Sequence, residues 1–187
     1  MGKIKVIETG FSGLVLLEPV TFHDSRGYFF ESYNQNDYFN AGLNFVSVQD
    51  NESSSVRGVI RGLHFQNDPH AQSKLIRVID GEIYDVAVDL RRGSPTFGKW
   101  HGVILDSVSK MQFFIPKGFA HGFSVLSDKA IVMYKCDEYY SPSDEGSINA
   151  LDPSLSIDWK VEAGKDILSA KDMKNPFFAE SKHNFKF

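Results

Sequence analysis

Seven side chains in this sequence could together carry acid–base chemistry. A histidine titrates near neutrality and its basicity rises beside a carboxylate, and a tyrosine can return a proton. A fixed lysine or arginine can stabilise a developing negative charge. Such a set could move protons by itself, provided that the fold brings its members to one cavity. They are Arg61, His64, Lys74, Asp85, His121, Tyr134 and Asp172.

Residues 111–123 hold the most informative spacing, because an apolar run enters a Pro-x-Gly-x-x-His turn and leaves as another apolar run. Pro116 and Gly118 predict a tight reversal that directs His121 into the concave side of a barrel. The spacing resembles the second motif of the cupin jelly rolls. In metal-binding cupins, that motif joins an earlier His-x-His and a Glu to form a set of nitrogen and oxygen ligands. The earlier segment here, RGLHF, has His64 alone, so we expect the scaffold without its metal site.

Short strands dominate the predicted secondary structure. Residues 74–91 are apolar or alternate in two halves around Asp80-Gly81, a dipeptide typical of a hairpin turn. We therefore predict an all-β, cupin-type jelly roll, a barrel or sandwich with a few short helices. The other candidate strands are Leu14 to Leu17, Gly27 to Tyr33, Phe45 to Gln49, Gly58 to Phe65, Trp100 to Leu105, Lys110 to Ile115, Gly122 to Val125 and Ala130 to Asp137.

The predicted helices are too short to carry the core. Asn34 to Gly42 has Asn and Asp near its start and a Gly at its end, which suits a short helix. Ser169 to Asn175 could form another, stopped by Pro176. The strands must therefore position the chemistry. Tyr134, on a late strand, could face the same interior as the strands that carry the earlier candidates.

Composition limits the kind of protein this can be. A chain of 187 residues, 42% of them hydrophobic, can close one core, and we expect a single domain over residues 1–187. The formal net charge of -4 is spread along the chain, so we expect no nucleic-acid partner. The single Cys136 cannot form an internal disulfide and residues 1–11 lack the apolar region of a secretory signal, which favours a reducing, cytoplasmic setting. No window approaches the roughly 18 apolar residues of a membrane span, so no membrane partner is expected.

Longer stretches carry a resemblance to a known family. The chain is similar to the dTDP-4-dehydrorhamnose 3,5-epimerases over most of its length, with the motifs in family order, which a lone short motif could not establish. The matching stretches are DSRGYFFESY at 24–33, VQDNESSS at 48–55, VIRGLHFQ at 59–66, SKLIRVIDGEIYDVAVDLRRGSPTFGKW at 73–100, IPKGFAHGFSVLS at 115–127, YKCDEYYSPSDEGSI at 134–148 and LSAKD at 168–172.

The resemblance implies a reaction and roles in it. In a dTDP-linked 4-keto-6-deoxyhexose, removing the hydrogen at C3 or C5 gives an enolate delocalised onto the C4 oxygen. His64 matches the family's base, Asp172 the carboxylate that orients it, and Tyr134 the acid on the opposite face. Lys74 matches the cation near the C4 oxygen. His121, with Asp85, resembles a second polar pair that orients neighbouring groups.

The resemblance also implies how the nucleotide is bound. Arginine suits a diphosphate, and an aromatic ring gives the planar base a stacking surface. In the family, the early strand with the Arg-Gly-x-Phe-x-Glu pattern crosses to a neighbouring subunit, which implies a homodimer whose sites are completed by the partner. No cofactor is implied. The residues that match the family's substrate-binding positions are Arg26, Phe29, Glu31, Gln49, Asn51, Arg61, Tyr140 and Lys171, with His121 added from the barrel interior.

Each role competes with a structural one. Tyr134 could be a core ring with its hydroxyl at the edge. Asp172, three residues after a serine, lies where a helix capping pair would lie, which is compatible with orienting a histidine. The turn explains His121 equally well, and Lys74 and Arg61 could be solvated charges at strand ends.

Other readings of the chain stay open at this stage. The chain has Ala150 where family members commonly have a Trp, which could reshape the margin of the pocket, and some relatives invert C3 alone or use another nucleotide. A metal-dependent cupin oxygenase or isomerase is an alternative from another class, to be tested by metal analysis. A carbohydrate-binding β-sandwich that binds sugar without reaction is a further alternative.

Overall fold

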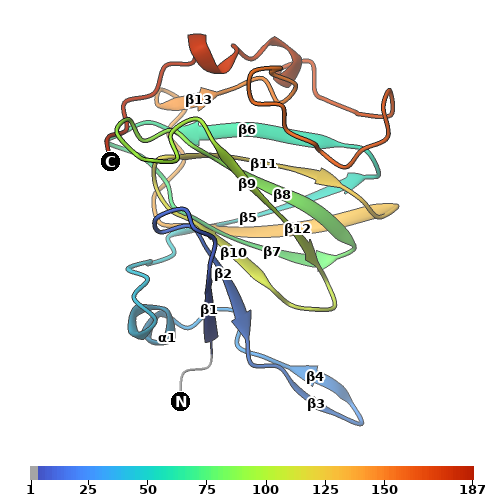
Figure 1. Ribbon diagram of the computed structural model, residues 1–187. Coiled ribbons are helices and arrows are strands. Elements are labelled where there is room, and N and C mark those ends of the chain that lie inside the picture. The colour runs from blue at the N-terminus through green and yellow to red at the C-terminus, as the bar shows by residue number, and fades with distance from the viewer. Residues whose placement is uncertain (1–3) are drawn as a thin grey trace.

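The computed structural model describes residues 4–187 and consists mostly of antiparallel strands in two facing sheets (Figure 1). This confirms the predicted all-β fold with few short helices. The six-stranded sheet contains, in spatial order, β1 (Ile4–Glu8), β2 (Val15–Pro19), β10 (Gln112–Ile115), β7 (Lys74–Asp80), β12 (Lys129–Cys136) and β5 (Gln49–Val56). The five-stranded sheet contains β13 (Glu145–Ser147), β6 (Ile60–Gln66), β11 (Phe119–Val125), β8 (Glu82–Asp89) and β9 (Trp100–Asp106). The hairpin β3 (Phe22–Asp24) and β4 (Gly27–Phe29), the helix α1 (Gln35–Asn40), and the 3₁₀ turns η1 (Asp172–Lys174) and η2 (Phe178–Glu180) complete the fold.

Strand β8 shows how the sequence pattern places a charged group inside the fold. Ile83 and Ala87 join the core between the sheets, whereas Tyr84 and Val86 join a second core on the other side of the strand. Because side chains alternate along a strand, Asp85 points to the same interior as Ile83 and Ala87. Burial on both faces explains why this strand is an almost continuous apolar run in the sequence.

Segments outside the two sheets cover their outer faces. The chain after β13, drawn in orange and red, lies over β6 and β13, and its Leu155 and Trp159 belong to the second core (Figure 1). Tyr38 of α1 and Phe45 pack in a third core against the six-stranded sheet. Polar side chains that lie between the two sheets are therefore in an otherwise apolar interior, and their presence there indicates a specific role.

Asp80-Gly81 does not form the predicted hairpin. Strand β7 pairs with β10 and β12, whereas β8 pairs with β11 and β9, so the dipeptide joins one sheet to the other. Gly81 has φ +81°, and a Cβ there would lie 2.1 Å from the carbonyl oxygen of Lys129. Glycine is required at this corner because the backbones approach so closely. The dipeptide marks a turn correctly, but the pairing depends on strands distant in sequence.

Strand β5 was misplaced by the sequence prediction. The predicted strand over Phe45–Gln49 is wrong, because residues 45–48 form no strand and β5 begins at Gln49. Its residues QDNESSSV carry almost no apolar signal, since β5 is an edge strand that alternates between partly buried and exposed polar side chains. The predicted strand over Gly27–Tyr33 is also too long, because β4 ends at Phe29.

The short helical segments follow their capping signals. Asn34 caps α1 by accepting a hydrogen bond from the backbone N–H of Asn36, as the sequence predicts. The predicted helix over Ser169–Asn175 is reduced to the single turn η1. The backbone N–H of Asp172 donates to Ser169 Oγ at 3.0 Å, which is one half of the predicted capping pair, whereas the Asp172 side chain lies against His64.

The turn at Pro116 and Gly118 carries the chain from β10 in one sheet to β11 in the other, which confirms the predicted reversal. On β11, Gly122 lies against Gly62 of β6, where a Cβ on Gly62 would be 2.6 Å from the Gly122 Cα. Only glycine permits this approach, and it brings the backbones of the two histidine-bearing strands together.

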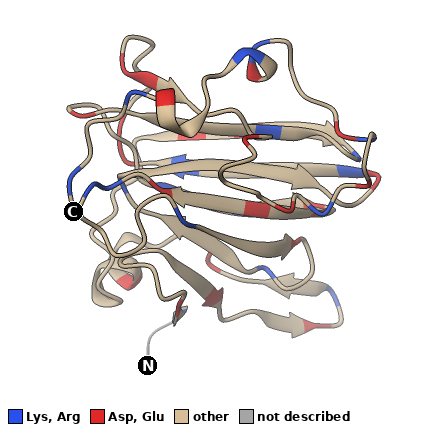
Figure 2. Cartoon of the chain, turned by 45° about the horizontal axis from the view of Figure 1, so that its top comes forward, with Lys and Arg blue, Asp and Glu red and all other residues tan. Residues whose placement is uncertain are grey.

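Charges are interspersed over the molecule. Figure 2 shows Lys and Arg alternating with Asp and Glu over strands and loops, as the even distribution along the sequence predicts. Within residues 4–187, no helix is long and apolar enough to cross a membrane.

Candidate active site

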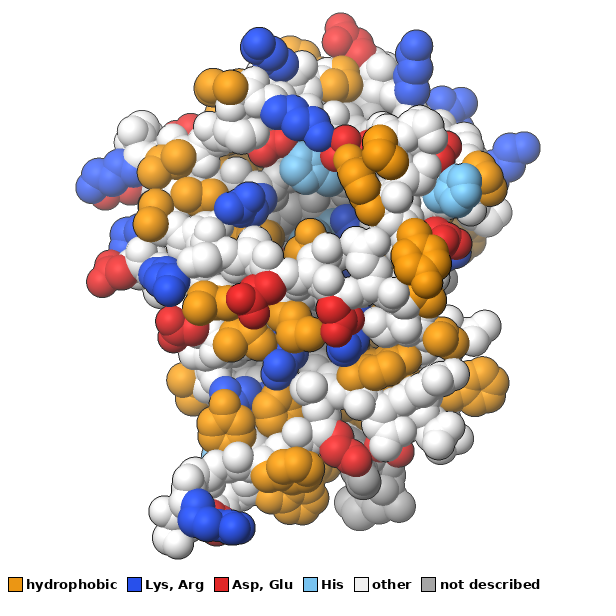
Figure 3. All heavy atoms as spheres, turned by 180° about the vertical axis from the view of Figure 1, so that it is seen from behind, with side chains coloured by type: hydrophobic (Ala, Val, Ile, Leu, Met, Phe, Trp, Pro, Cys, Tyr) orange, Lys and Arg blue, Asp and Glu red, His pale blue; other side chains and the backbone are white. Residues whose placement is uncertain are grey.

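A hollow opens between the two sheets, with histidine side chains visible in it (Figure 3). It has two adjoining parts that share three residues, His64, Lys74 and Tyr134, so these three lie where the parts meet. The first part is also lined by Ser53, Arg61, His121, Phe123, Ser169, Lys171 and Asp172. The second is also lined by Gln49, Asn51, Phe65, Gln66, Gln72, Tyr140 and Glu145.

His64 and Asp172 form a hydrogen-bonded pair. The Nε2 atom of His64 on β6 lies 2.7 Å from Oδ1 of Asp172, whose side chain is buried by η1 packing on the sheet. Burial lowers the pKa of His64, and Asp172 opposes that shift. The imidazole is thus neutral near pH 7, and because Nε2–H is held by the carboxylate, Nδ1 carries the lone pair. Asp172 begins η1, where its backbone N–H is bound by Ser169 Oγ, and its side chain pairs with His64.

A second pair of the same kind lies beside the first. His121 on β11 is the register partner of His64 on β6, and its Nε2 lies 2.9 Å from Oδ1 of Asp85. Burial raises the pKa of Asp85, although His121 acts in the opposite direction. Among residues 4–187, no three His, Cys, Asp or Glu side chains are grouped so that they could hold a metal ion.

Lys74 and Tyr134 come from neighbouring strands of the opposite sheet. The Lys74 ammonium lies 6.0 Å from the centroid of the Tyr134 ring. Burial lowers the pKa of Lys74 and raises the pKa of Tyr134, so the phenol keeps its proton at neutral pH. The Tyr134 ring also packs against the core between the sheets. The residue therefore has a structural contact as well as a place on the cavity wall.

Two cations, Arg61 and Lys171, line the first part of the hollow. Arg61 Nε donates to Ser55 Oγ at 2.9 Å, which fixes its guanidinium. Lys171 Nζ lies 2.8 Å from Oε2 of Glu145, a carboxylate that also accepts a hydrogen bond from the Tyr140 hydroxyl at 3.2 Å. These residues could bind an anionic group next to the histidine pairs.

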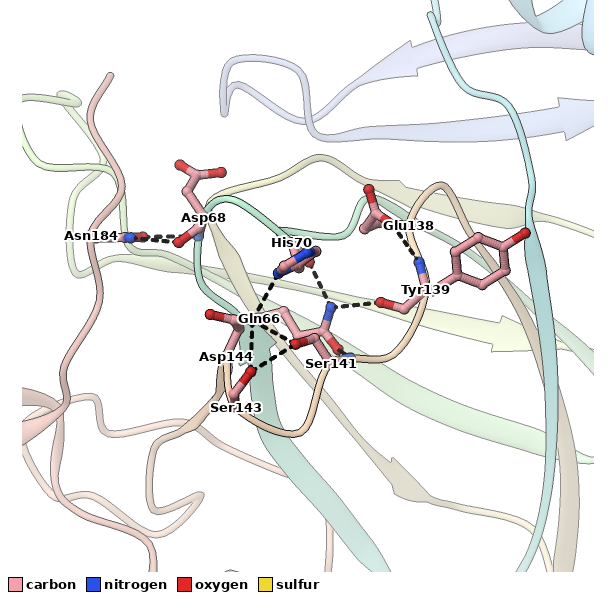
Figure 4. A network of polar contacts seen from close by, with 9 residues as sticks. All are labelled: Gln66, Asp68, His70, Glu138, Tyr139, Ser141, Ser143, Asp144 and Asn184. Atoms are coloured by element: carbon pink, nitrogen blue, oxygen red, sulfur yellow. Dashed lines mark hydrogen bonds and ion pairs between the residues drawn. The ribbon is translucent and has the colours of Figure 1, made fainter.

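The backbone around Tyr140 is held by two glutamine side chains. Gln66 Nε2 donates to the Tyr139 carbonyl at 3.1 Å, and Gln66 Oε1 accepts from the Ser141 N–H at 2.8 Å (Figure 4). Gln49 Oε1 accepts from the Tyr140 N–H at 3.0 Å. Gln66 Nε2 also donates to the His70 carbonyl at 2.6 Å, so a single buried amide joins two loops at the edge of the hollow (Figure 4).

The hairpin residues do not reach this cavity. Arg26 and Phe29 lie on β3 and β4 or their turn, Glu31 follows them, and none of the three lines either part of the hollow. Figure 1 shows the hairpin projecting away from the sheets at the opposite end from β6 and β13. Arg26 forms an ion pair with Asp24 at 2.6 Å, and Phe29 is exposed.

Ala150, at the position where family members commonly have a Trp, does not line the hollow. It is buried in the second core, where its carbonyl accepts a hydrogen bond from Trp159 Nε1 at 2.7 Å.

The structure adds wall residues that the sequence reasoning missed. Ser53 alternates with Gln49 and Asn51 on β5, so the inward period of that strand could have identified it. Gln66 closes the RGLHFQ stretch and Glu145 lies on β13, but no local pattern distinguishes them from surface polar residues. The remaining predicted residues of the same chain do meet, since they line one part of the hollow or the other: Gln49, Asn51, Arg61, His64, Lys74, His121, Tyr134, Tyr140, Lys171 and Asp172.

Comparisons with known proteins agree with this geometry. Residues 8–180 match the family model for dTDP-4-dehydrorhamnose 3,5-epimerase. An enzyme of that name from Methanothermobacter thermautotrophicus is 51% identical over 173 residues, covering 92% of this chain and 93% of the relative. The crystal structure of one from Elizabethkingia anophelis aligns with a TM-score of 0.91 and 47% identity, covering 95% of this chain and 98% of that one. A dTDP-6-deoxy-D-glucose-3,5-epimerase from Legionella pneumophila, in complex with dTDP-4-keto-L-rhamnose, aligns with a TM-score of 0.90 and 48% identity, covering 95% and 94%.

Proposed function

The chain belongs to the dTDP-4-dehydrorhamnose 3,5-epimerase family, and on that premise we propose that it inverts C3 and C5 of a dTDP-linked 4-keto-6-deoxyhexose in deoxysugar biosynthesis. It is a carbohydrate epimerase. One observation carries the proposal: a carboxylate-bound imidazole, a protonated phenol and a lysine line the same hollow. That set supplies a base, an acid and a cation, which are the three groups needed to form an enolate and return its proton.

His64 is the proposed base. The hydrogens at C3 and C5 are acidified by the C4 ketone, and a neutral imidazole can remove either one. Because Asp172 holds Nε2–H, the lone pair of Nδ1 accepts the proton, and the carboxylate then stabilises the imidazolium. The pair His121–Asp85, in register beside it, supports the orientation of His64 and the sugar.

Lys74 and Tyr134 act on the enolate. A positive charge on Lys74 stabilises the developing oxyanion at C4. Tyr134 donates its proton to the carbon from the face opposite His64, which inverts that centre. Both lie on the six-stranded sheet, whereas His64 lies on the five-stranded sheet, and this division suits attack and return from two sides of one pyranose.

The nucleotide occupies the remaining polar walls in this proposal. Arg61 and Lys171 bind the diphosphate, since their charges are permanent or nearly so at neutral pH. Tyr140 stacks on the base, and Gln49 and Asn51 bind its polar edge. The Legionella structure with dTDP-4-keto-L-rhamnose supports a ligand of this class for the family.

We further propose a homodimer in which the hairpin completes the partner's site. Arg26, Phe29 and Glu31 lie far from their own chain's hollow, and the hairpin projects from the body of the molecule (Figure 1). An exposed aromatic ring and an arginine on such an arm suit contact with a base and a phosphate in a neighbouring copy. We also propose that residues 1–187 act as one domain in the cytoplasm, a setting that suits the free thiol of Cys136.

Proton NMR of the keto-sugar nucleotide in deuterated water tests the function. We expect deuterium to enter at both C3 and C5, with formation of the rhamno-configured product. Exchange at C3 alone would show that the enzyme inverts only C3. Binding without exchange at either position would instead identify a carbohydrate-binding protein and refute the proposal.

A further inference from the structure

One wall of the hollow is a ladder of polar side chains on β5. Gln49, Asn51, Ser53 and Ser55 are buried or partly buried, whereas the residues between them are exposed, so these four share the inner face of the strand. The inner face of a strand in the six-stranded sheet would ordinarily carry apolar side chains. The polar ladder therefore needs partners for its donors and acceptors.

Three members of this ladder have partners within the chain. Gln49 Nε2 donates to Asn51 Oδ1 at 3.1 Å, and Asn51 Nδ2 lies 3.8 Å from the sulfur of Cys136. Ser55 Oγ accepts from Arg61 Nε at 2.9 Å. The ladder residues on both sides of Ser53 therefore have hydrogen-bond partners within the chain.

Ser53 is the exception. Its Oγ is buried and has no hydrogen-bond partner within residues 4–187. The other such atom in the described chain, Nδ1 of His183, lies among the rings of Phe97 and Phe178 and lines neither part of the hollow. A buried hydroxyl without a partner destabilises a fold, so a position that keeps one at a cavity wall points to a ligand.

The position of Ser53 indicates what it would meet. In the β5–β12 register, Ser53 is opposite Val132 and Asn51 is opposite Tyr134, so the hydroxyl lies diagonally beside the phenol on the same wall. On its other side, Ser55 holds the guanidinium of Arg61. Ser53 thus lies between the residue proposed as the acid and the residue proposed for the diphosphate, and it lines the hollow with both.

We propose that the Ser53 hydroxyl donates a hydrogen bond to an oxygen of the bound nucleotide sugar, on the Tyr134 side of the cavity. The inference rests on the proposed function. The acceptor is an oxygen of the pyranose or of its adjoining phosphate, the two parts of the ligand that extend between Tyr134 and Arg61. Ser53 is a substrate-binding residue that places the sugar against the acid.

The test compares Ser53→Ala with Ser54→Ala, its neighbour on the outward face of the same strand. Thermal unfolding of the ligand-free proteins is measured first. Because Ser53 Oγ has no partner, Ser53→Ala should melt at or above the wild-type temperature, and Ser54→Ala should melt with wild type. Calorimetric titrations with dTDP and with dTDP-glucose, which has no ketone and is not turned over, then measure binding.

We expect Ser53→Ala to lose about tenfold in affinity for dTDP-glucose, the loss of one hydrogen bond. Equal loss with dTDP would assign the contact to the phosphate, and unchanged binding of dTDP would assign it to the pyranose. Ser53→Thr, which keeps a hydroxyl on a β-favouring residue, should restore binding. Wild-type affinity of Ser53→Ala for both ligands would overturn the inference, as would a lower melting temperature with unchanged binding.

The two proposals fail separately. A wild-type protein that binds dTDP-glucose but does not exchange hydrogen in the keto-sugar would refute the epimerase function alone. Full epimerisation and wild-type binding by Ser53→Ala would refute the Ser53 contact and leave the epimerase function in place.

Discussion

His64 and His121 occupy opposed positions on the neighbouring strands β6 and β11, and each imidazole is bound by its own carboxylate. The two pairs differ in access, because the His64 side chain is 34% exposed and that of His121 is 8% exposed. A base must reach a carbon of the substrate, so this difference supports the proposal that His64 abstracts the proton and His121 orients its neighbours.

Asp172→Asn should shift the acid limb of the pH profile. Burial lowers the pKa of His64 and the Asp172 carboxylate raises it, so removing the charge lowers that pKa further. The acid limb of kcat/KM should move to lower pH, and the plateau should fall by about 100-fold or more because the imidazole loses orientation and basicity. Measured profiles of wild type, Asp172→Asn and the exposed control Asp128→Asn would show it. An acid limb at its wild-type position in Asp172→Asn would separate Asp172 from the base.

The alkaline limb should belong to Lys74. Burial lowers the pKa of Lys74 toward neutral pH and raises that of Tyr134 away from it, which favours Lys74 as the group behind the alkaline limb. Lys74→Arg, which stays charged, should move this limb upward, and Lys74→Met should lower kcat across the whole range. Tyr134→Phe in the same assay provides the control, since its residual exchange should keep the wild-type limb. A limb unmoved by Lys74→Arg would contradict the assignment.

Gln66→Leu should weaken substrate binding more than catalysis. The amide holds the Tyr139 and His70 carbonyls and the Ser141 N–H, and all three contacts would be lost together. At about 1 kcal/mol for each hydrogen bond, KM should rise by about tenfold or more while kcat changes little. Asn184→Ala, which removes only the two hydrogen bonds between the Asn184 amide and the Asp68 backbone, should leave KM unchanged (Figure 4). Equal KM values for Gln66→Leu and wild type would show that the amide does not position Tyr140.

A mixing experiment tests the shared site. Arg26→Ala and His64→Ala homodimers should each be inactive or nearly so, because each site lacks one group. After exchange of subunits, about half of the dimers are mixed and each has one intact site, so activity should return to about a quarter of wild type. Mixing two His64→Ala samples supplies the blank. No recovery in the mixed sample, with subunit exchange verified by mass, would place Arg26 in its own chain's site or in none.

Local signals predicted the fold class, and together with the resemblance they predicted many of the residues that line the hollow. Asn34 caps α1, the Pro116–Gly118 turn reverses between sheets, and His121 points inward, each as its neighbours in sequence imply. Asp172 was a candidate by residue type, but its pairing with His64 was expected only from the resemblance, and that contact spans 108 residues. Long-range contacts of this kind leave no local pattern.

Features that depend on distant partners were missed for physical reasons. Asp80-Gly81 looks like a hairpin because turn chemistry is local, whereas the choice of neighbouring strands is global. Strand β5 was placed too early because its inward face is polar, and an apolar alternation is what sequence reading detects. Gln66 could not be distinguished in sequence from other polar strand residues, because its role depends on contacts with two loops, at His70 and Tyr139.

The proposed mechanism requires His64 to remove the proton and Tyr134 to return one from the opposite face. The most direct measurement is proton NMR in deuterated water with His64→Ala and Tyr134→Phe, scoring hydrogen exchange and inversion separately. His64→Ala should abolish exchange at C3 and C5 while nucleotide binding stays nearly intact. Tyr134→Phe should lose inversion more than exchange, since the enolate still forms. Full turnover by either variant would contradict the mechanism.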